Sequence, residues 1–492
     1  MRLRLWVRRQ LPIARRRLAF SINQTMSLFE LAFPDSDARH KAAAAGLRDA
    51  LEEPIHYSFS FPVARWLARR CPGELSIDWD EFDDTSRLDE LLARILHPAE
   101  DEYFDSGWVS SREWIDMARA GTEGTDFDWL MAQLGSKRLR PFWNQLYDAA
   151  EIPLAWDLSR SRFSKARNVL KVGHVRTRER GMRQRPRSPK QEIMRPLAKM
   201  RPLSAREGAR LIDIAMASLA VRYRETYHFN YANPREVYLA DVGEGVSVAV
   251  FGLLAEHRFP LECTMGYLIL SNGVPIGYGG SSVLFKQVNT GVNIFDEFRG
   301  SEAAFLWTQV MRVYHSLVGC TRFIANPYQF GAGNTEALKS GAFWFYYRLG
   351  YRPVLPDVRK LAQREDARIR RDRNYRSNIK TLRKLASCDM HLSLPGARAA
   401  ELFDEQWIET SSMLATDYLG KAGGNARQKS GPLVPFVAVA QAANWSARDK
   451  RLTRQLLQAK LGEHEAHYAR LLCKHDKLLI SLKKACKRAD SE

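Results

Sequence analysis

Cysteine is scarce in this chain, and the few cysteines lie far apart. The 492 residues include six, namely Cys71, Cys263, Cys320, Cys388, Cys473 and Cys486. No two of them stand at the spacing of a metal-binding pair or of a dense disulfide framework. The pattern favours thiols that stay reduced, so we expect a cytoplasmic protein.

Long apolar runs are missing as well. The best candidate, residues 434–443, is short and is interrupted by Pro435 and Gln441. A helix that spans a bilayer needs about 20 predominantly apolar residues. The sequence therefore predicts no transmembrane segment.

The signatures of several enzyme classes are absent. The eleven histidines include no HExxH motif and no paired spacing, and His315 is interpreted as a packing residue. The chain has no GxSxG elbow and no Walker loop. These absences argue against metal-dependent and serine-hydrolase chemistry, and no metal is expected.

Positive charge, in contrast, is abundant. The chain has 75 Lys and Arg against 56 Asp and Glu, a net charge of +19. Basic residues concentrate in segments 176–201 and 359–384, whereas segment 74–105 is acidic. Such a balance attracts polyanions such as nucleic acid, anionic lipid or a phosphorylated ligand. The alternative is that each charged run is simply a solvated face.

The N-terminal 203 residues divide into three parts by composition. Residues 1–25 form a basic extension, which is either a membrane-surface or nucleic-acid arm, or a segment upstream of a natural start at Met26. Residues 26–170 show helical periodicity and predict a helical domain. Residues 171–203 are rich in basic residues and proline, which indicates a linker able to contact a polyanion.

A mixed α/β domain is predicted for residues 204–395. Ser204 and Glu207 have the spacing of a capping box that begins a helix. Strand pairs follow, one of them around Asn272-Gly273, a turn pair that tolerates positive φ. A strand, a helix, a strand and an aromatic-rich helix complete the order. It indicates a mostly antiparallel sheet with packed helices, followed by a mainly helical region over residues 396–492.

The aromatic-rich helix carries a family likeness. The segment "EALKSGAFWFYYRLGYRP", residues 336–353, resembles the last motif of the GNAT superfamily of N-acetyltransferases, N-x-x-A-x-x-x-Y-x-K-x-G-F. The matched positions are Ala342, Tyr346, Arg348, Gly350 and Tyr351. Lys339 stands at the asparagine position, which is a departure. The resemblance implies a GNAT-like fold over residues 204–395.

The stretch "VNIFDEFRGSEAAFLW", residues 292–307, resembles the family's coenzyme A loop, (R/Q)-x-x-G-x-(G/A). Backbone N–H groups at a helix start attract a pyrophosphate, and small residues allow its close approach. By the resemblance, acyl-coenzyme A would contact Ile294, Phe295, Arg299, Gly300, Ser301, Ala303, Ala304 and Asn334. Glu302 replaces the central glycine. It points either into the loop, where it would repel a phosphate, or to solvent, and we expect the second.

In the family, a substrate amine attacks the acyl thioester directly. The resemblance gives Tyr346 the role of the acid that protonates the thiolate, although it could equally be one packing residue of an aromatic cluster. Glu297 and Glu262, and also Asp296, are the candidates for the base. The leading hypothesis is an N-acyltransferase with acetyl-CoA or another acyl-CoA as co-substrate. The alternative is an inactive GNAT-like scaffold that binds a protein or polyanion.

Overall fold

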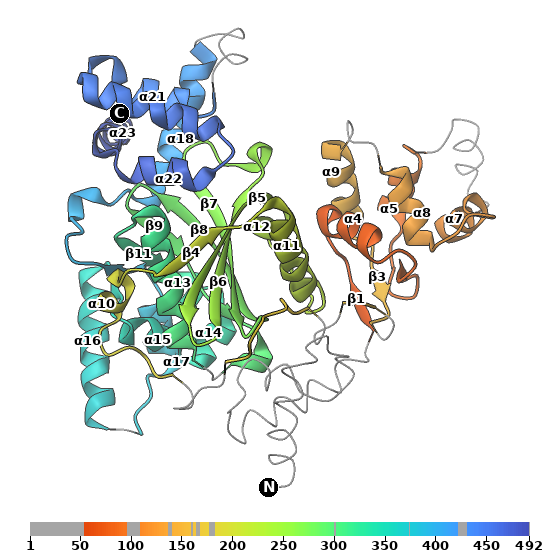
Figure 1. The fold of residues 1–492 in the computed structure, drawn as a ribbon, viewed down its shortest axis with the longest axis horizontal. Helices are drawn as coiled ribbons and strands as arrows, with labels where there is room; N and C mark the ends of the chain where they lie inside the picture. The colour runs from red at the N-terminus through yellow and green to blue at the C-terminus, as the bar shows by residue number, and fades with distance from the viewer. Residues whose placement is uncertain are drawn as a thin grey trace. The chain divides into compact units, whose positions relative to one another are not determined.

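The computed structural model describes residues 54–95, 109–135, 140–158, 161–163, 168–176, 183–299, 302–372, 374–421 and 431–491. The expected basic extension, residues 1–25, lies outside this part. The chain divides into two units (Figure 1): unit 1 comprises Met1–Val175 and Leu211–Tyr231, and unit 2 comprises Arg176–Arg210 and Ala232–Glu492. Within the described ranges, no helix has the length and apolarity to cross a membrane.

One sheet organises unit 2. In the described chain it has ten strands in the order β12-β13-β11-β9-β8-β7-β6-β5-β4, with β10 paired to β8. Their bounds are β4 (Lys199–Pro202), β5 (Ala232–Gly243), β6 (Val246–Leu253), β7 (Cys263–Ser271), β8 (Val274–Leu284), β9 (Gln287–Thr290), β10 (Asn293–Ile294), β11 (Arg322–Ala325), β12 (Arg352–Pro353) and β13 (Met390–Ser393). These pairs are antiparallel except β9 with β11. The predicted mixed α/β class with a mostly antiparallel sheet is confirmed.

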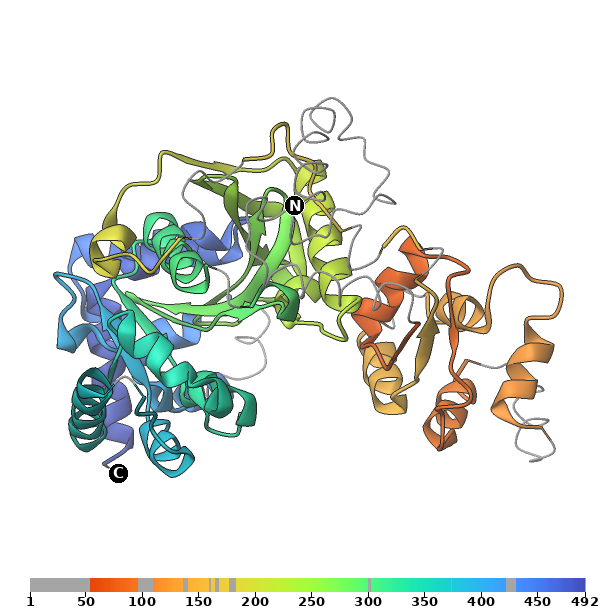
Figure 2. The same ribbon diagram turned by 90° about the horizontal axis from the view of Figure 1, so that it is seen from below.

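The middle of the sheet forms from hairpins. Strands β7 and β8 are joined at Asn272 and Gly273, whose φ angles are +49° and +81°. A tight two-residue turn needs this left-handed backbone, which Asn and Gly adopt at low cost. Every residue of β7 is buried, and within unit 2 (Figure 2) the helix Glu465–Cys473 contacts β6, β7 and β8 while the helix Ala303–Val318 contacts β6. The turn predicted at this pair is therefore correct.

Strands β9 and β10 are two parts of one strand that changes its neighbours. Both pair with β8 in the same register, β9 over residues 287–290 and β10 over residues 293–294. On the other side, β11 pairs in parallel with residues 287–289. The interruption between β9 and β10 falls at Gly291 and Val292. The parallel pairing with β11 thus ends at Asn289, just before a two-residue break in the pairing with β8, which resumes at Asn293.

Helix α13 (Ala303–Val318) makes the crossover between the parallel strands and ends at Gly319 with a φ of +83°. A parallel pair requires such a crossover. The aromatic-rich segment is not one helix but two, α14 (Thr335–Ser340) and α15 (Ala342–Arg348). Gly341, at a φ of +67°, ends the first and precedes the second. Helices α16 (Pro356–Arg371) and α17 (Ile379–Leu385) follow.

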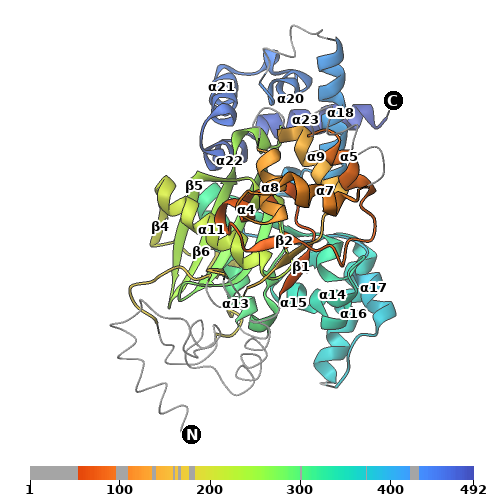
Figure 3. The same ribbon diagram turned by 90° about the vertical axis from the view of Figure 1, so that its right-hand side faces the viewer.

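The C-terminal region is helical, as expected. Its helices gather in one group (Figure 3) and include α18 (Glu405–Lys421), α20 (Val434–Val439), α21 (Ala447–Leu461), α22 (Glu465–Cys473) and α23 (Asp476–Ala489). Helix α22 contacts β6, β7 and β8. Tyr468 of this helix is fully buried. The region is thus packed against the sheet rather than tethered to it.

Part of the predicted linker is ordered structure. Helix α10 (Pro189–Met194) packs against α13, and β4 pairs with β5 at the edge of the sheet. The buried Arg312 of α13 donates to the carbonyl of Arg195 at 2.8 Å, and Gln309 donates to Glu192 at 2.8 Å. These buried polar groups need partners, and the linker supplies them. Sequence periodicity could not reveal this because the contacts are long-range.

Unit 1 combines short helices with a small sheet. The sheet has the order β1-β3-β2, with β1 (Ile55–Tyr57), β2 (Leu75–Ile77) and β3 (Leu154–Trp156). The helices are α4 (Phe61–Arg70), α5 (Ser86–Leu92), α7 (Ser111–Ala118), α8 (Asp126–Gln133) and α9 (Arg140–Ala150). Trp66 of α4 donates to Asp213 at 2.9 Å, which ties segment Leu211–Tyr231 to this unit. The helical expectation missed the sheet because strands of three residues carry no clear period.

Candidate functional site

The point where β9–β10 leaves β11 is the most distinctive backbone feature of unit 2. The hydroxyl of Tyr267 donates to the carbonyl of Gly291. A Cβ at residue 291 would lie 2.0 Å from Oε1 of Gln329, so this glycine allows a close approach. Tyr346 of α15 has a hydrogen bond with the backbone of Val292. Polar side chains from three elements therefore converge on two backbone residues.

Tyr346 is buried in an aromatic cluster. Its ring has edge-to-face contacts with Trp307 at 6.5 Å and with Tyr351 at 5.3 Å between ring centroids. Burial raises the pKa of Tyr346 above that of an ordinary phenol, and the Val292 backbone hydrogen bond partly offsets this rise. The side chain is thus a neutral hydroxyl at physiological pH. It can donate a proton to a stronger base and also packs, so both predicted roles are compatible with its position.

Glu302 occupies the N-cap position of α13, and its side chain is buried. Its Oε1 accepts a hydrogen bond from the backbone N–H of Arg183 at 2.6 Å. The expected solvent orientation is therefore wrong, because a main-chain donor from the linker segment draws the carboxylate inward. The guanidinium of Arg183 lies 4.5 Å from the ring centroid of Phe305 and 2.7 Å from Glu244.

The remaining loop residues have defined positions, with two exceptions. Arg299 forms ion pairs with Asp296, at 2.8 Å, and with Glu336. Asn334 caps α14 by accepting from the backbone N–H of Ala337 at 3.0 Å. Gly300 and Ser301 lie outside the described residues. Arg299 and Asn334 thus both have intramolecular partners.

The other predicted contact residues flank the same loop. Ile294 ends β10 and is partly exposed. Phe295 is buried, and its ring lies 5.4 Å from that of Tyr278. Ala303 and Ala304 form the first turn of α13 and are partly exposed. The alanines are thus the small residues that leave the start of this helix approachable.

Glu262 is remote from Tyr346. It precedes Cys263, which pairs across β8 with the level of Val288. Val292 lies four residues farther along that strand, about 13 Å at 3.3 Å per residue. A base must reach its proton directly or through one water, so the structure does not bring these two residues together as base and acid. Glu297 lies in the short turn Asp296–Phe298 beside the loop, and its side-chain position lies outside what the structure describes.

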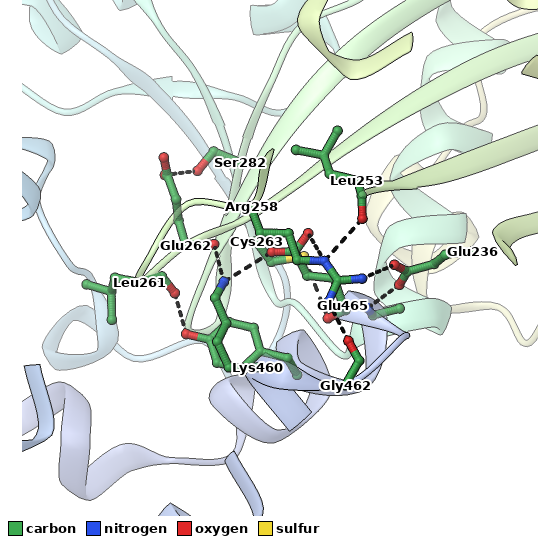
Figure 4. Close-up of polar contacts among 12 residues, drawn as sticks. Glu236, Leu253, Arg258, Leu261, Glu262, Cys263, Ser282, Lys460, Gly462 and Glu465 are labelled. Atoms are coloured by element: carbon green, nitrogen blue, oxygen red, sulfur yellow. Dashed lines mark hydrogen bonds and ion pairs between the residues drawn. The ribbon is translucent and has the colours of Figure 1, made fainter. Parts of the chain in front are cut away.

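The main-chain carbonyl of Glu262 joins a buried ionic network (Figure 4), whereas its carboxylate accepts a hydrogen bond from Ser282. Lys460 donates to the Glu262 carbonyl and to Glu465, at 3.1 Å in both cases. Arg258 stands 3.3 Å from Glu236 and 3.7 Å from Glu465. The four charged side chains of these ion pairs are at most 3% exposed. The network fastens α21 and α22 to the start of β7.

Sequence reasoning missed several residues of the strand separation. Arg183, Tyr267 and Gln329 come from the linker, from β7 and from the turn before α14. No local spacing relates them, because each reaches the site only through the tertiary fold. The "YQF" triplet before "GAGN" was the nearest available signal for Gln329.

No protein-family model, curated protein or solved structure matches this chain. The contacts described above are therefore the basis for any functional conclusion.

Proposed function

We propose that unit 2 is an acyl-CoA-dependent N-acyltransferase of GNAT type, which transfers an acyl group to the amine of an acceptor. The observation that carries the proposal is the separation of the parallel strands β9 and β11 beside Tyr346. The parallel pairing with β11 ends at Asn289, so the edge of β9–β10 beyond that residue is open to an elongated polar ligand that seeks backbone hydrogen bonds. The crossover helix α13 begins near this end of the strand, which adds a donor-rich helix start.

Acyl-CoA would supply the activated thioester, and this chain would supply binding and a proton. Ala303 and Ala304 fit a phosphate because they are small and partly exposed. Arg299 could exchange its ion pair with Glu336 for a phosphate. Tyr346 is neutral and hydrogen-bonded to Val292, so it holds the proton that a leaving thiolate needs, although its raised pKa makes it a weaker acid than an ordinary phenol.

A second candidate, the inactive GNAT-like scaffold, is favoured by Glu302. Its buried carboxylate stands at the N-terminus of α13 and is held by the backbone N–H of Arg183. Two unit charges about 4 Å apart repel by roughly 4 kcal/mol at an effective dielectric of 20. This repulsion exceeds the roughly 1 kcal/mol that an exposed helix end offers to an anion. In that case unit 2 would bind a protein or polyanion instead.

Calorimetric titration of acetyl-CoA and of a longer acyl-CoA into the full chain tests the proposal. Saturable binding by the native protein is expected, with retained binding but about 10²-fold or greater loss of turnover in Tyr346→Phe. Tyr347→Phe, on the same helix, is the matched control and should keep its activity.

Glu302→Gln separates the two candidates. Glutamine keeps an acceptor for the Arg183 N–H but removes the charge. If only this variant binds acyl-CoA, the native chain is the scaffold. If neither protein binds, the acyltransferase proposal fails.

A further inference from the structure

Two carboxylates meet in unit 1 without a cation. Asp148 of α9 accepts a hydrogen bond from the backbone N–H of Phe61 at 2.7 Å. Glu225 accepts from the N–H of Ser60 at 3.0 Å and from the side chain of Asn230 at 3.3 Å. Both groups therefore stand at the N-terminus of α4. No described Lys, Arg or His forms an ion pair with either.

The start of α4 accounts for only part of this charge. A helix N-terminus is equivalent to roughly half a positive charge, whereas the two carboxylates together carry two negative charges. Burial and then the charge of Glu225 raise the pKa of Asp148, while the Phe61 N–H lowers it. More than one negative charge thus stays uncompensated by the contacts of this cluster.

Unpaired polar atoms surround the carboxylates. The hydroxyl of Tyr147 is buried and has no hydrogen-bond partner among the described residues, and the same holds for Oδ1 of Asn144 and Oγ1 of Thr226. Tyr147 is only 1% exposed, and its hydroxyl lies within the fields of Asp148 and Glu225. Buried polar atoms without partners are rare in proteins and call for a specific explanation.

Two pairs of tyrosine rings lie near the cluster, because the charge of Glu225 acts on one ring of each pair, Tyr57 and Tyr231. Tyr57 and Tyr223 have ring centroids 6.0 Å apart, and Tyr227 and Tyr231 are 4.8 Å apart. Tyr223 and Tyr227 are 44% and 40% exposed, large values for aromatic residues beside a buried core. Asp148 is itself exposed. Asp148 is thus accessible to solvent, whereas its neighbour Tyr147 is buried.

We propose that Asp148, Glu225, Tyr147 and the surrounding tyrosines form a binding site for the ammonium group of an organic amine. Carboxylates neutralise an ammonium, aromatic faces attract it through cation–π contact, and an ammonium donates three hydrogen bonds. The Tyr147 hydroxyl and the Oδ1 atom of Asn144, which have no hydrogen-bond partner in the described chain, supply acceptors for those donors, while the Asn144 side chain also bonds Tyr231. A metal ion fits less well, because the described residues contain no group of three His, Cys, Asp or Glu side chains suited to hold one.

The site rests on contacts within unit 1 alone. Its test is therefore independent of whether unit 2 binds acyl-CoA. The probe is 1,5-diaminopentane, titrated into the full chain by calorimetry at constant ionic strength. 1,5-Pentanediol, which has the same length but no charge, is the matched neutral probe. Saturable binding of the diamine and none of the diol are expected.

Variants locate the binding. Asp148→Asn keeps the acceptor for the Phe61 N–H and should weaken the diamine about 10- to 100-fold, as expected for a lost charge-assisted contact. Tyr147→Phe should weaken it about fivefold or more. Glu123→Gln removes an exposed carboxylate elsewhere in unit 1 and should leave the affinity unchanged. Circular dichroism confirms that each variant is folded.

Three outcomes would overturn the proposal. The first is the absence of saturable diamine binding by the native protein. The second is equal binding of diamine and diol, which would indicate a site without charge recognition. The third is an equal loss of affinity in Asp148→Asn and Glu123→Gln, which would show that only the overall negative charge matters.

Discussion

Carboxylates lie in two polar clusters of this protein, and their surroundings differ in one respect. In unit 2, Glu236 and Glu465 flank Arg258, and Lys460 pairs with Glu465. In unit 1, Asp148 and Glu225 share only backbone and neutral donors. The first cluster is closed to solvent, whereas Asp148 is exposed.

The difference separates charges that hold the fold from charges available to a ligand. A buried charge is tolerated when an opposite charge and hydrogen bonds surround it. The network around Arg258 meets that condition, and it joins the C-terminal helices to the sheet. The cluster around Asp148 does not, and buried acceptors without hydrogen-bond partners in the described chain lie in the same unit. Variants that remove one member from each cluster test this distinction.

Arg258→Met should have the largest effect. It leaves Glu236 and Glu465 buried without their cation. Removing one partner of a buried ion pair typically lowers the unfolding free energy by about 3–5 kcal/mol. Arg235→Met is the control, because Arg235 and Glu463 pair at 3.2 Å with side chains 66% and 67% exposed. The control should lose about 1 kcal/mol or less. Denaturant unfolding measures both, and similar losses would contradict the distinction.

Stability should also depend on pH through Glu236. Burial raises its pKa to about 7, while the Ala466 and Glu465 backbone N–H groups and then Arg258 lower it. The folded protein holds this proton more tightly than the unfolded chain, so the associated stability is complete below about pH 4 and is lost as pH rises through 7. The difference is about 3–4 kcal/mol. Glu236→Gln should flatten the fall in unfolding free energy between pH 5 and 7, and an unchanged slope would exclude Glu236 as its source.

Two buried tyrosines, Tyr468 and Tyr147, allow a matched comparison in which removing the hydroxyl should change the unfolding free energy by smaller amounts. The Tyr468 hydroxyl donates to the Leu261 carbonyl, whereas the Tyr147 hydroxyl has no partner in the described chain. Tyr468→Phe should therefore cost about 1–2 kcal/mol of unfolding free energy. Tyr147→Phe should be neutral or slightly stabilising, within about 1 kcal/mol. If Tyr147→Phe destabilises the protein as much as Tyr468→Phe, the Tyr147 hydroxyl has a structural partner.

Asp148→Asn should produce the smallest change. Removing its charge relieves repulsion from Glu225 but also weakens the hydrogen bond from Phe61. At an exposed position these opposing effects should leave a net change of about 0.5 kcal/mol or less. Thermal unfolding in the absence of amine measures it. A large loss would mean that Asp148 serves mainly as a cap of α4.

Local sequence signals were reliable where neighbouring residues make the contact. Ser204 and Glu207 form the predicted capping box, with the Ser204 N–H donating to Glu207 at 2.9 Å. Asn272 and Gly273 form the predicted turn. Both depend on interactions over four residues or fewer, so a short window of sequence contains all the information.

Signals failed where the partner is distant in the chain. Glu302 was expected at the surface because acids are common in the first turn of a helix, but the N–H of Arg183, 119 residues away, holds it inside. Glu262 was a candidate base by position, and the register of β7 with β8 set it far from Tyr346. GNAT-type catalysis itself stays a proposal.

The sequence alone determined the α/β character of unit 2, its hairpin turns and its helix starts, because these follow from periodicity and local hydrogen bonding. Only the tertiary structure decided where the strands separate, which carboxylates are paired with cations, and which polar atoms stay free. Those properties arise when residues far apart in the sequence come into contact and are removed from water. Glu236 and Glu465, for example, both pair with Arg258. In the sequence, the carboxylates of the two clusters look alike. Their surroundings in the fold decide whether a carboxylate stabilises the protein through an ion pair or is available to bind a ligand.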